Sequence, residues 1–152
     1  MTKKERALLA VQTLEEVYPQ ATCALQYEKP YELLIAVRLS AQCTDARVNQ
    51  ITPKLFAAYP TLESLAAADI ADLEDIVRPC GFFHMKAKSI KEMSAQLILN
   101  FGGVVPDNME DLLSLSGVGR KTANLILGDV YGKPAIVADT HFIRITGRLG
   151  LT

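Results

Sequence analysis

The segment SGVGRKTAN (residues 116–124) places a Gly-Val-Gly turn between two helical stretches, Asp107–Leu113 and Lys121–Val130. Glycine lets the backbone turn tightly and approach a ligand closely. Successive amides ahead of a helix start bind anions, and the helix dipole reinforces this binding. The pattern predicts a helix-hairpin-helix unit that grips a phosphate backbone without reading sequence. A plain αα-corner that binds nothing remains the alternative, because so short a motif is weak by itself.

The rest of the chain also has helical periodicity, and no stretch alternates with the period of a strand. Asp107 with Glu110 resembles a capping box at the start of the helix before the hairpin. Pro53 is expected to kink or restart the helix that contains it. The other expected helices span residues 3–17, 30–40, 44 or 45 through at least 56, 61–67, 71–77, 85–101 and 140–149. We therefore predict an all-α protein of one domain, without internal repeats or linkers.

Composition restricts the possible partners. The 152 residues carry a formal net charge of −1, so no global positive field attracts a polyanion. Basic residues gather locally in Arg78–Lys91 and Ser116–Arg148, each beside a turn, which favours a local binding face. No signal-peptide core is present and no apolar run reaches the roughly 18 residues of a membrane span. We expect a soluble, intracellular protein.

The three cysteines, Cys23, Cys43 and Cys80, have neither metal-site nor disulfide spacing. We expect all three to be reduced and buried.

Lys121 and Asp139 form the candidate chemical site. The dipole of a helix start disfavours a cation, so Lys121 is either a tolerated surface residue or an amine that reacts. Asp139, in VADTHFIR, precedes the last helix, where an aspartate is most often an N-cap. The turn Tyr131–Pro134 can bring the two residues together, and an amine beside a carboxylate is a nucleophile with its activator. Both interpretations stay open on spacing alone.

Three motifs in order, LSAQCTD (39–45), SGVGRKTAN (116–124) and VADTHFIRITGRLGL (137–151), closely resemble the endonuclease III family. These are helix-hairpin-helix DNA glycosylases with AP-lyase activity. The resemblance implies a two-lobed helical bundle with a groove between the lobes. Residues 30–115 would form one lobe with the DNA wedge loops, 107–130 the helix-hairpin-helix, and 1–29 with 131–152 part of the second lobe.

The resemblance also implies the chemistry. Lys121 matches the nucleophile that attacks the sugar C1′ and forms a Schiff base, and Asp139 matches the carboxylate that activates it and stabilises positive charge on the sugar. The implied reaction removes oxidised pyrimidines from duplex DNA in base excision repair, followed by β-elimination, without a catalytic metal. Adenine-mismatch glycosylases lack this lysine. The expected place of action is the cytoplasm, in association with the bacterial nucleoid, or otherwise inside the cell.

DNA contacts follow from the same resemblance. Gln42 matches a residue that fills the gap left by a flipped nucleotide, and Phe82 stands where the family has an apolar wedge. For Phe82 and Phe83 the alternative is one ring in the core and one at the surface. His141 is expected to hydrogen-bond near the site or to a phosphate, or else to be a buried structural histidine. The remaining expected DNA-binding residues are Gly117, Val118, Gly119, Arg120 and Arg144.

Two departures concern the hairpin. Ser116 stands where the family usually has proline, which predicts a slightly less rigid hairpin. Leu113 stands where family members often carry an acid, although Glu110 and Asp111 are close by.

A third departure concerns the C-terminal part. Family members continue into a four-cysteine segment that holds a 4Fe-4S cluster, and no cysteine here has that spacing. We expect a piece of a longer protein, or a natural truncation, with no cofactor in these residues. The helix at residues 3–17 would then expose its apolar face or associate with a second copy.

Two other functions stay open at this point. One is a DNA-binding module that uses only the hairpin and its basic flanks. The other is a monofunctional glycosylase for another base.

Overall fold

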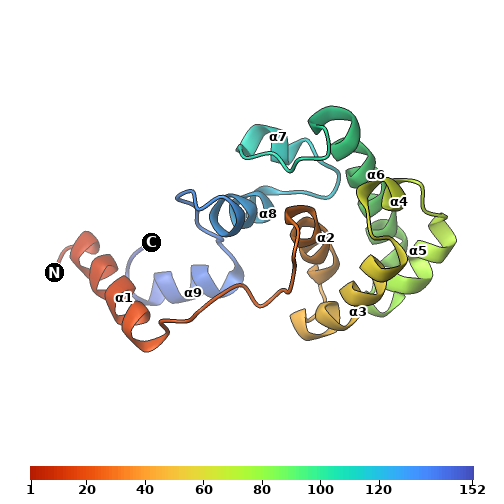
Figure 1. Cartoon of the computed structure of the whole chain (residues 1–152). Helices are drawn as coiled ribbons and strands as arrows, with labels where there is room; N and C mark the ends of the chain where they lie inside the picture. Colours follow the sequence, from red (N-terminus) through yellow and green to blue (C-terminus); the bar gives the residue numbers. More distant parts are fainter.

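The computed structural model describes residues 1–152 and is entirely helical, with no strand (Figure 1). The α-helices are α1 (Lys3–Val17), α2 (Pro30–Ser40), α3 (Asp45–Ala58), α4 (Leu62–Ala66), α5 (Ile70–Val77), α6 (Phe83–Phe101), α7 (Met109–Leu113), α8 (Arg120–Leu125) and α9 (Thr140–Arg148). A 3₁₀ turn, η1 (Arg78–Cys80), precedes α6, and a π-helix, η2 (Ile126–Val130), continues α8. The predicted all-α class is confirmed.

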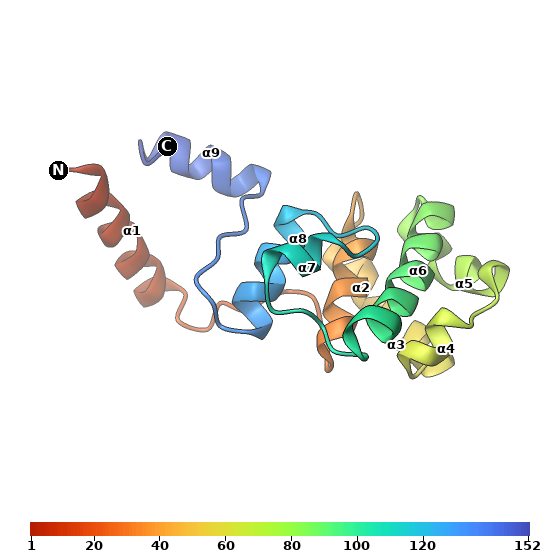
Figure 2. The ribbon, with the colours of Figure 1, turned by 90° about the horizontal axis from the view of Figure 1, so that it is seen from above.

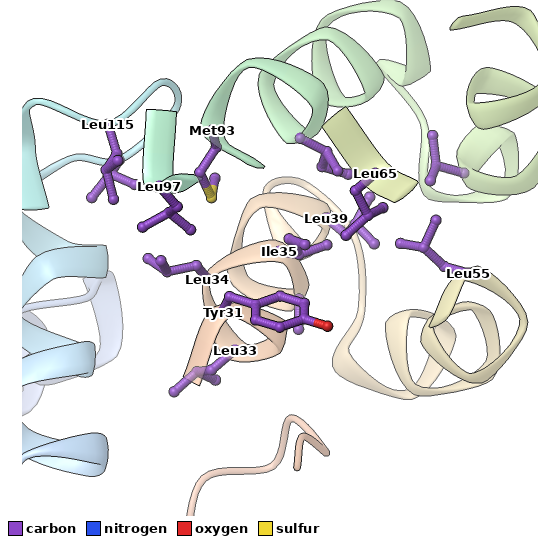
Figure 3. Packing of buried hydrophobic residues seen from close by; sticks show 14 of the residues in the cluster. Tyr31, Leu33, Leu34, Ile35, Leu39, Leu55, Leu65, Met93, Leu97 and Leu115 are labelled. Carbon is purple, nitrogen blue, oxygen red and sulfur yellow. The ribbon is translucent and has the colours of Figure 1, made fainter. Parts of the chain in front are cut away.

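The core is built around α2, whose sequence is apolar on nearly every face. Leu33, Leu34, Ala36 and Leu39 have no exposed surface. Figure 3 shows side chains of α2 among those of α3, α4 and α6, all in one cluster of 26 buried residues. Each fully buried aliphatic side chain contributes roughly 1.5–3 kcal/mol. This packing makes α2 and α6 the support for the hairpin and for the segments that carry Gln42 and Phe82.

The two terminal helices, α1 and α9, lie beside each other and away from the body formed by α2–α8 (Figures 1 and 2). The Arg6 guanidinium joins them, since Nη1 donates to the carbonyls of Leu149 (3.0 Å) and Gly150 (3.2 Å). No residue of α1 is buried, so the expectation that this helix exposes its apolar face is confirmed.

Caps set most helix starts. Thr2, Thr44 and Asp69 accept from first-turn amides of α1, α3 and α5. The predicted cap at Asp107 is wrong, because Asn108 caps α7 by accepting from the Asp111 amide at 2.9 Å. Either side chain can cap a helix, and only the path of the chain after Pro106 decides between them.

Other boundaries also differ from the prediction. Helix α3 runs through Pro53 without a restart, and α6 begins at Phe83, two residues before the predicted Met85. The predicted helix through Val130 is α-helical only to Leu125. No helix has the combined length and hydropathy needed to cross a membrane.

Candidate DNA-binding and catalytic site

The hairpin lies between α7 and α8. Gly117 has a φ of +74°, and a Cβ there would lie 2.8 Å from Cδ and Nε of Arg38 and 3.2 Å from Cβ of Ser89. Conformation and space therefore both require glycine at this position. Val118 is buried beneath the turn, whereas Gly119 is the N-cap of α8 and offers no side-chain acceptor. The amides of the first turn of α8 thus stay available to an external acceptor.

Ser116 attaches the hairpin to α6. Its amide donates to Oε1 of Gln96 at 2.7 Å, and its hydroxyl donates to Oε2 of Glu92 at 2.9 Å. A proline at this position could make neither hydrogen bond. Leu113 packs against the hydrophobic core, so it occupies this place as an apolar contact.

Lys121 and Asp139 lie close enough for the charge of Lys121 to act on the Asp139 carboxyl. Lys121 is exposed in the first turn of α8, and Asp139 is the N-cap of α9, with Oδ1 accepting from the Phe142 amide at 2.7 Å. That backbone hydrogen bond is the main reason why the pKa of Asp139 lies below its ordinary value. The charges of His141 and Lys121 also lower this pKa. Asp139 is therefore an ionised carboxylate at the N-terminus of α9, near the exposed amine of Lys121.

The basic residues around this pair face solvent. His141 is exposed, so the alternative of a buried structural histidine is wrong. Its Nδ1 lies 3.2 Å from Nη2 of Arg144, which is also exposed. Arg120 is exposed beside Lys121 at the start of α8. All three side chains can reach a ligand without displacing the core.

Gln42 and Phe82 share a backbone feature that the sequence did not predict. They are the non-glycine residues with positive φ, at 53° and 45° respectively. Both are exposed, Phe82 to 63%, and both line one pocket at the end of α2. Phe83, by contrast, packs against the core, with the Arg78 guanidinium 4.3 Å from its ring centroid. Phe82 is thus the free ring and Phe83 the packed one.

Sequence reasoning missed the rest of this pocket, which Arg38, Ala41, Met85 and Lys86 complete. Arg38 also lies against Gly117, so one side chain connects the pocket to the hairpin. Lys86 is 1% exposed. A signal for its burial existed in the sequence, because Lys86 precedes Ile90, Met93 and Leu97 with helical spacing and so stands on an apolar face.

The cysteines do not match the prediction fully. Cys80 is buried, but Cys23 and Cys43 are only half-buried. Burial, together with the neighbouring Cys43 thiol, raises the pKa of Cys80 to about 11. No cluster of His, Cys, Asp or Glu side chains could hold a metal, so these residues do not fit the 4Fe-4S cluster that the resemblance implies for longer members.

Known proteins resemble this chain over nearly its whole length. Residues 35–152 match the HhH-GPD superfamily of base excision DNA repair proteins. Endonuclease III of Synechocystis sp. is 47% identical over 152 residues, which are 99% of this chain and 69% of that protein. Endonuclease III of Bacillus subtilis is 43% identical over 136 residues, which are 90% of this chain and 62% of that protein. The chain therefore spans about two thirds of the length of these relatives.

A solved structure agrees with the sequence relatives. The trapped endonuclease III–DNA covalent intermediate has a TM-score of 0.91 and 42% identity to this chain, and the match covers 99% of this chain and 70% of that one. Fold, hairpin and sequence point to the same group of proteins. The chain belongs to the endonuclease III family of base-excision-repair DNA glycosylases and AP lyases, within the HhH-GPD superfamily.

Proposed function

We propose that this chain removes an oxidised pyrimidine from duplex DNA and then cleaves the strand, with Lys121 as nucleophile and Asp139 as its charged partner. The observation that carries the proposal is the pairing of an exposed amine directly after the hairpin with a carboxylate that is held ionised. The hairpin, with Gly117, Val118 and Gly119, would hold the DNA backbone and bring the damaged nucleotide to the amine.

Lys121 first gives up its ammonium proton to solvent, and the resulting amine then attacks C1′ of the sugar. The bond from C1′ to the base breaks, and its electron pair leaves with the base, which takes up a proton. Opening of the sugar ring gives a Schiff base on Lys121. Loss of a C2′ proton then expels the 3′ phosphate by β-elimination, and water releases the enzyme.

Asp139 suits the part of this reaction in which positive charge develops. An ionised carboxylate stabilises positive charge on the sugar and on the iminium. The Phe142 amide fixes its position before the substrate arrives, so no reorganisation is needed when the charge forms. Arg120, His141 and Arg144 would hold phosphates around the same nucleotide.

Gln42 and Phe82 would support the opened duplex. A base can be reached by the amine only after it leaves the stack, which costs a few kcal/mol. An exposed aromatic ring that enters the stack and an amide that occupies the vacant position offset that cost. Both side chains project from the same pocket, which supports a shared task.

Borohydride trapping on duplex DNA with an abasic site tests the proposal. Wild type should give a covalent protein–DNA adduct, because borohydride reduces the Schiff base. Lys121→Ala should abolish the adduct while retaining salt-dependent DNA binding. Lys54→Ala, which removes an exposed lysine of α3, is the matched control and should form the adduct as wild type does.

The other two functions predict different outcomes. A DNA-binding module would bind the duplex but release no base and form no adduct. A monofunctional glycosylase would release a base, without any adduct. An adduct that persists in Lys121→Ala would refute the role of this lysine.

A further inference from the structure

Lys86 is a charged side chain in the interior. It is 1% exposed, lies on α6 and forms no ion pair. Its Nζ donates three hydrogen bonds, each 2.8 Å long, to the carbonyls of Leu39, Ala41 and Cys80. A buried ammonium is costly unless its donors are satisfied. Here all three donors have partners, so the group is accommodated as a tie between backbone segments.

The three carbonyls belong to two segments that lie far apart in the sequence. Leu39 and Ala41 form the end of α2, where the helix dipole favours a cation. Cys80 ends η1, the turn that leads into α6. A single ammonium therefore fixes the end of one helix against the approach to another.

Each tied segment leads directly into one of the residues with positive φ. Gln42 follows Ala41, and Phe82 lies two residues after Cys80. A left-handed backbone costs an L-residue roughly 1–3 kcal/mol and persists only where the surroundings impose it. Lys86 supplies such a constraint to both residues, and all three line the same pocket.

No carboxylate forms an ion pair with the Lys86 ammonium. Burial lowers the pKa of Lys86, the Cys80 and Cys43 thiols raise it, and Arg38 lowers it further. Carbonyl dipoles are thus its principal partners, and replacing the lysine would leave three of them unpaired.

We propose that Lys86 is a positioning residue that holds Gln42 and Phe82 together in the geometry with which they enter opened DNA. The proposal rests on the proposed function, because Gln42 and Phe82 must support an extruded nucleotide for their geometry to matter. Lys86 itself touches no DNA. It acts through the two segments that carry Gln42 and Phe82. Its replacement should therefore affect discrimination of damaged DNA more than binding to undamaged DNA.

The experiment compares affinity for a duplex with a tetrahydrofuran abasic analogue and for the undamaged duplex. In Lys86→Met, the ratio of the two affinities should fall about tenfold, while affinity for undamaged duplex stays within about twofold of wild type. Leu65→Ala, which opens a cavity at a fully buried position of α4, is the control for lost stability and should keep the wild-type ratio.

A double-mutant cycle shows whether Lys86 acts through the loops. In a Gln42→Ala, Phe82→Ala background, adding Lys86→Met should not lower the ratio further. If Lys86→Met does not fold, Lys86→Gln replaces it, and the ratio should again fall.

Three results would overturn the proposal. In the first, a folded Lys86 variant keeps the wild-type ratio. In the second, Lys86→Met weakens binding to both duplexes equally, as does Leu65→Ala. In the third, Lys86→Met lowers the affinity ratio in the Gln42→Ala, Phe82→Ala background by as much as it does in wild type. Failure of the proposed function is separate and visible in wild type alone, which would then show no preference for the abasic duplex and no trapped adduct.

Discussion

Asp139 combines a structural role with the proposed chemical one, and a single-atom change can separate them. Asparagine caps helices about as well as aspartate, so Asp139→Asn should keep the hydrogen bond from the Phe142 amide. It loses the negative charge, and we expect base release and adduct formation to fall about 100-fold or more. Asp139→Ala should lose both the activity and the cap, and so should also lower the melting temperature.

The pH dependence of stability checks the same residue. Because the folded pKa of Asp139 lies below its ordinary value of 3.8, the carboxylate stabilises the fold above that pH. This contribution is lost as pH falls through the folded pKa. Asp139→Asn should lack that dependence. If Asp139→Asn were as active as wild type, the only role of the Asp139 side chain would be to cap α9.

The hairpin with its supporting helix α6 is the element on which Ser116 acts. Ser116→Pro removes two hydrogen bonds, worth about 1 kcal/mol each, and leaves the Gln96 and Glu92 acceptors without them. Proline restricts the unfolded chain and can return only roughly 0.4–1 kcal/mol. We therefore expect a net loss in the free energy of unfolding, measured by urea denaturation.

Ser116→Ala is the matched variant, because it removes only the hydroxyl and keeps the hydrogen bond from the Ser116 backbone amide to Gln96. It should lose less stability than Ser116→Pro. A proline variant more stable than wild type would mean that hairpin rigidity outweighs both hydrogen bonds. The expectation of a less rigid hairpin stays a prediction.

At the scale of the whole molecule, α1 presents an apolar surface to solvent. Leu8 is 53% exposed and Leu14 57% exposed. We expect wild type to self-associate through this face as concentration rises, and Leu8→Gln with Leu14→Gln to weaken the association, as measured by sedimentation velocity. Each substitution should change the free energy of unfolding by less than about 0.5 kcal/mol, since neither side chain is in the core.

Leu65→Gln contrasts with the two substitutions in α1. Leu65 lies in α4 and is fully buried, so its replacement by a polar residue should unfold much of the protein. A wild-type chain that stays monomeric at every concentration would contradict the self-association.

Much of the helical framework could be read from the sequence because its causes are local. Apolar spacing places α1 and α2 correctly, and proline and glycine mark several helix ends. The three motifs that carry the family resemblance identify the Lys121–Asp139 pair in the same way. Errors of a few residues, such as the cap at Asn108 and the start of α6, arise where neighbouring residues are equally suitable and the chain path decides.

The sequence alone determined the fold class, the hairpin and the pair of residues proposed for catalysis, since each depends on residue type and spacing along one segment. Only the tertiary structure decided that Lys86 ties Leu39 and Ala41 to Cys80, and that Gln42 and Phe82 share a left-handed backbone and one pocket. The end of α2 is distant in the sequence from the lysine that ties it, since Leu39 and Lys86 are 47 residues apart. No local pattern encodes them, because the packing of α2 against α6 is what brings the segments together.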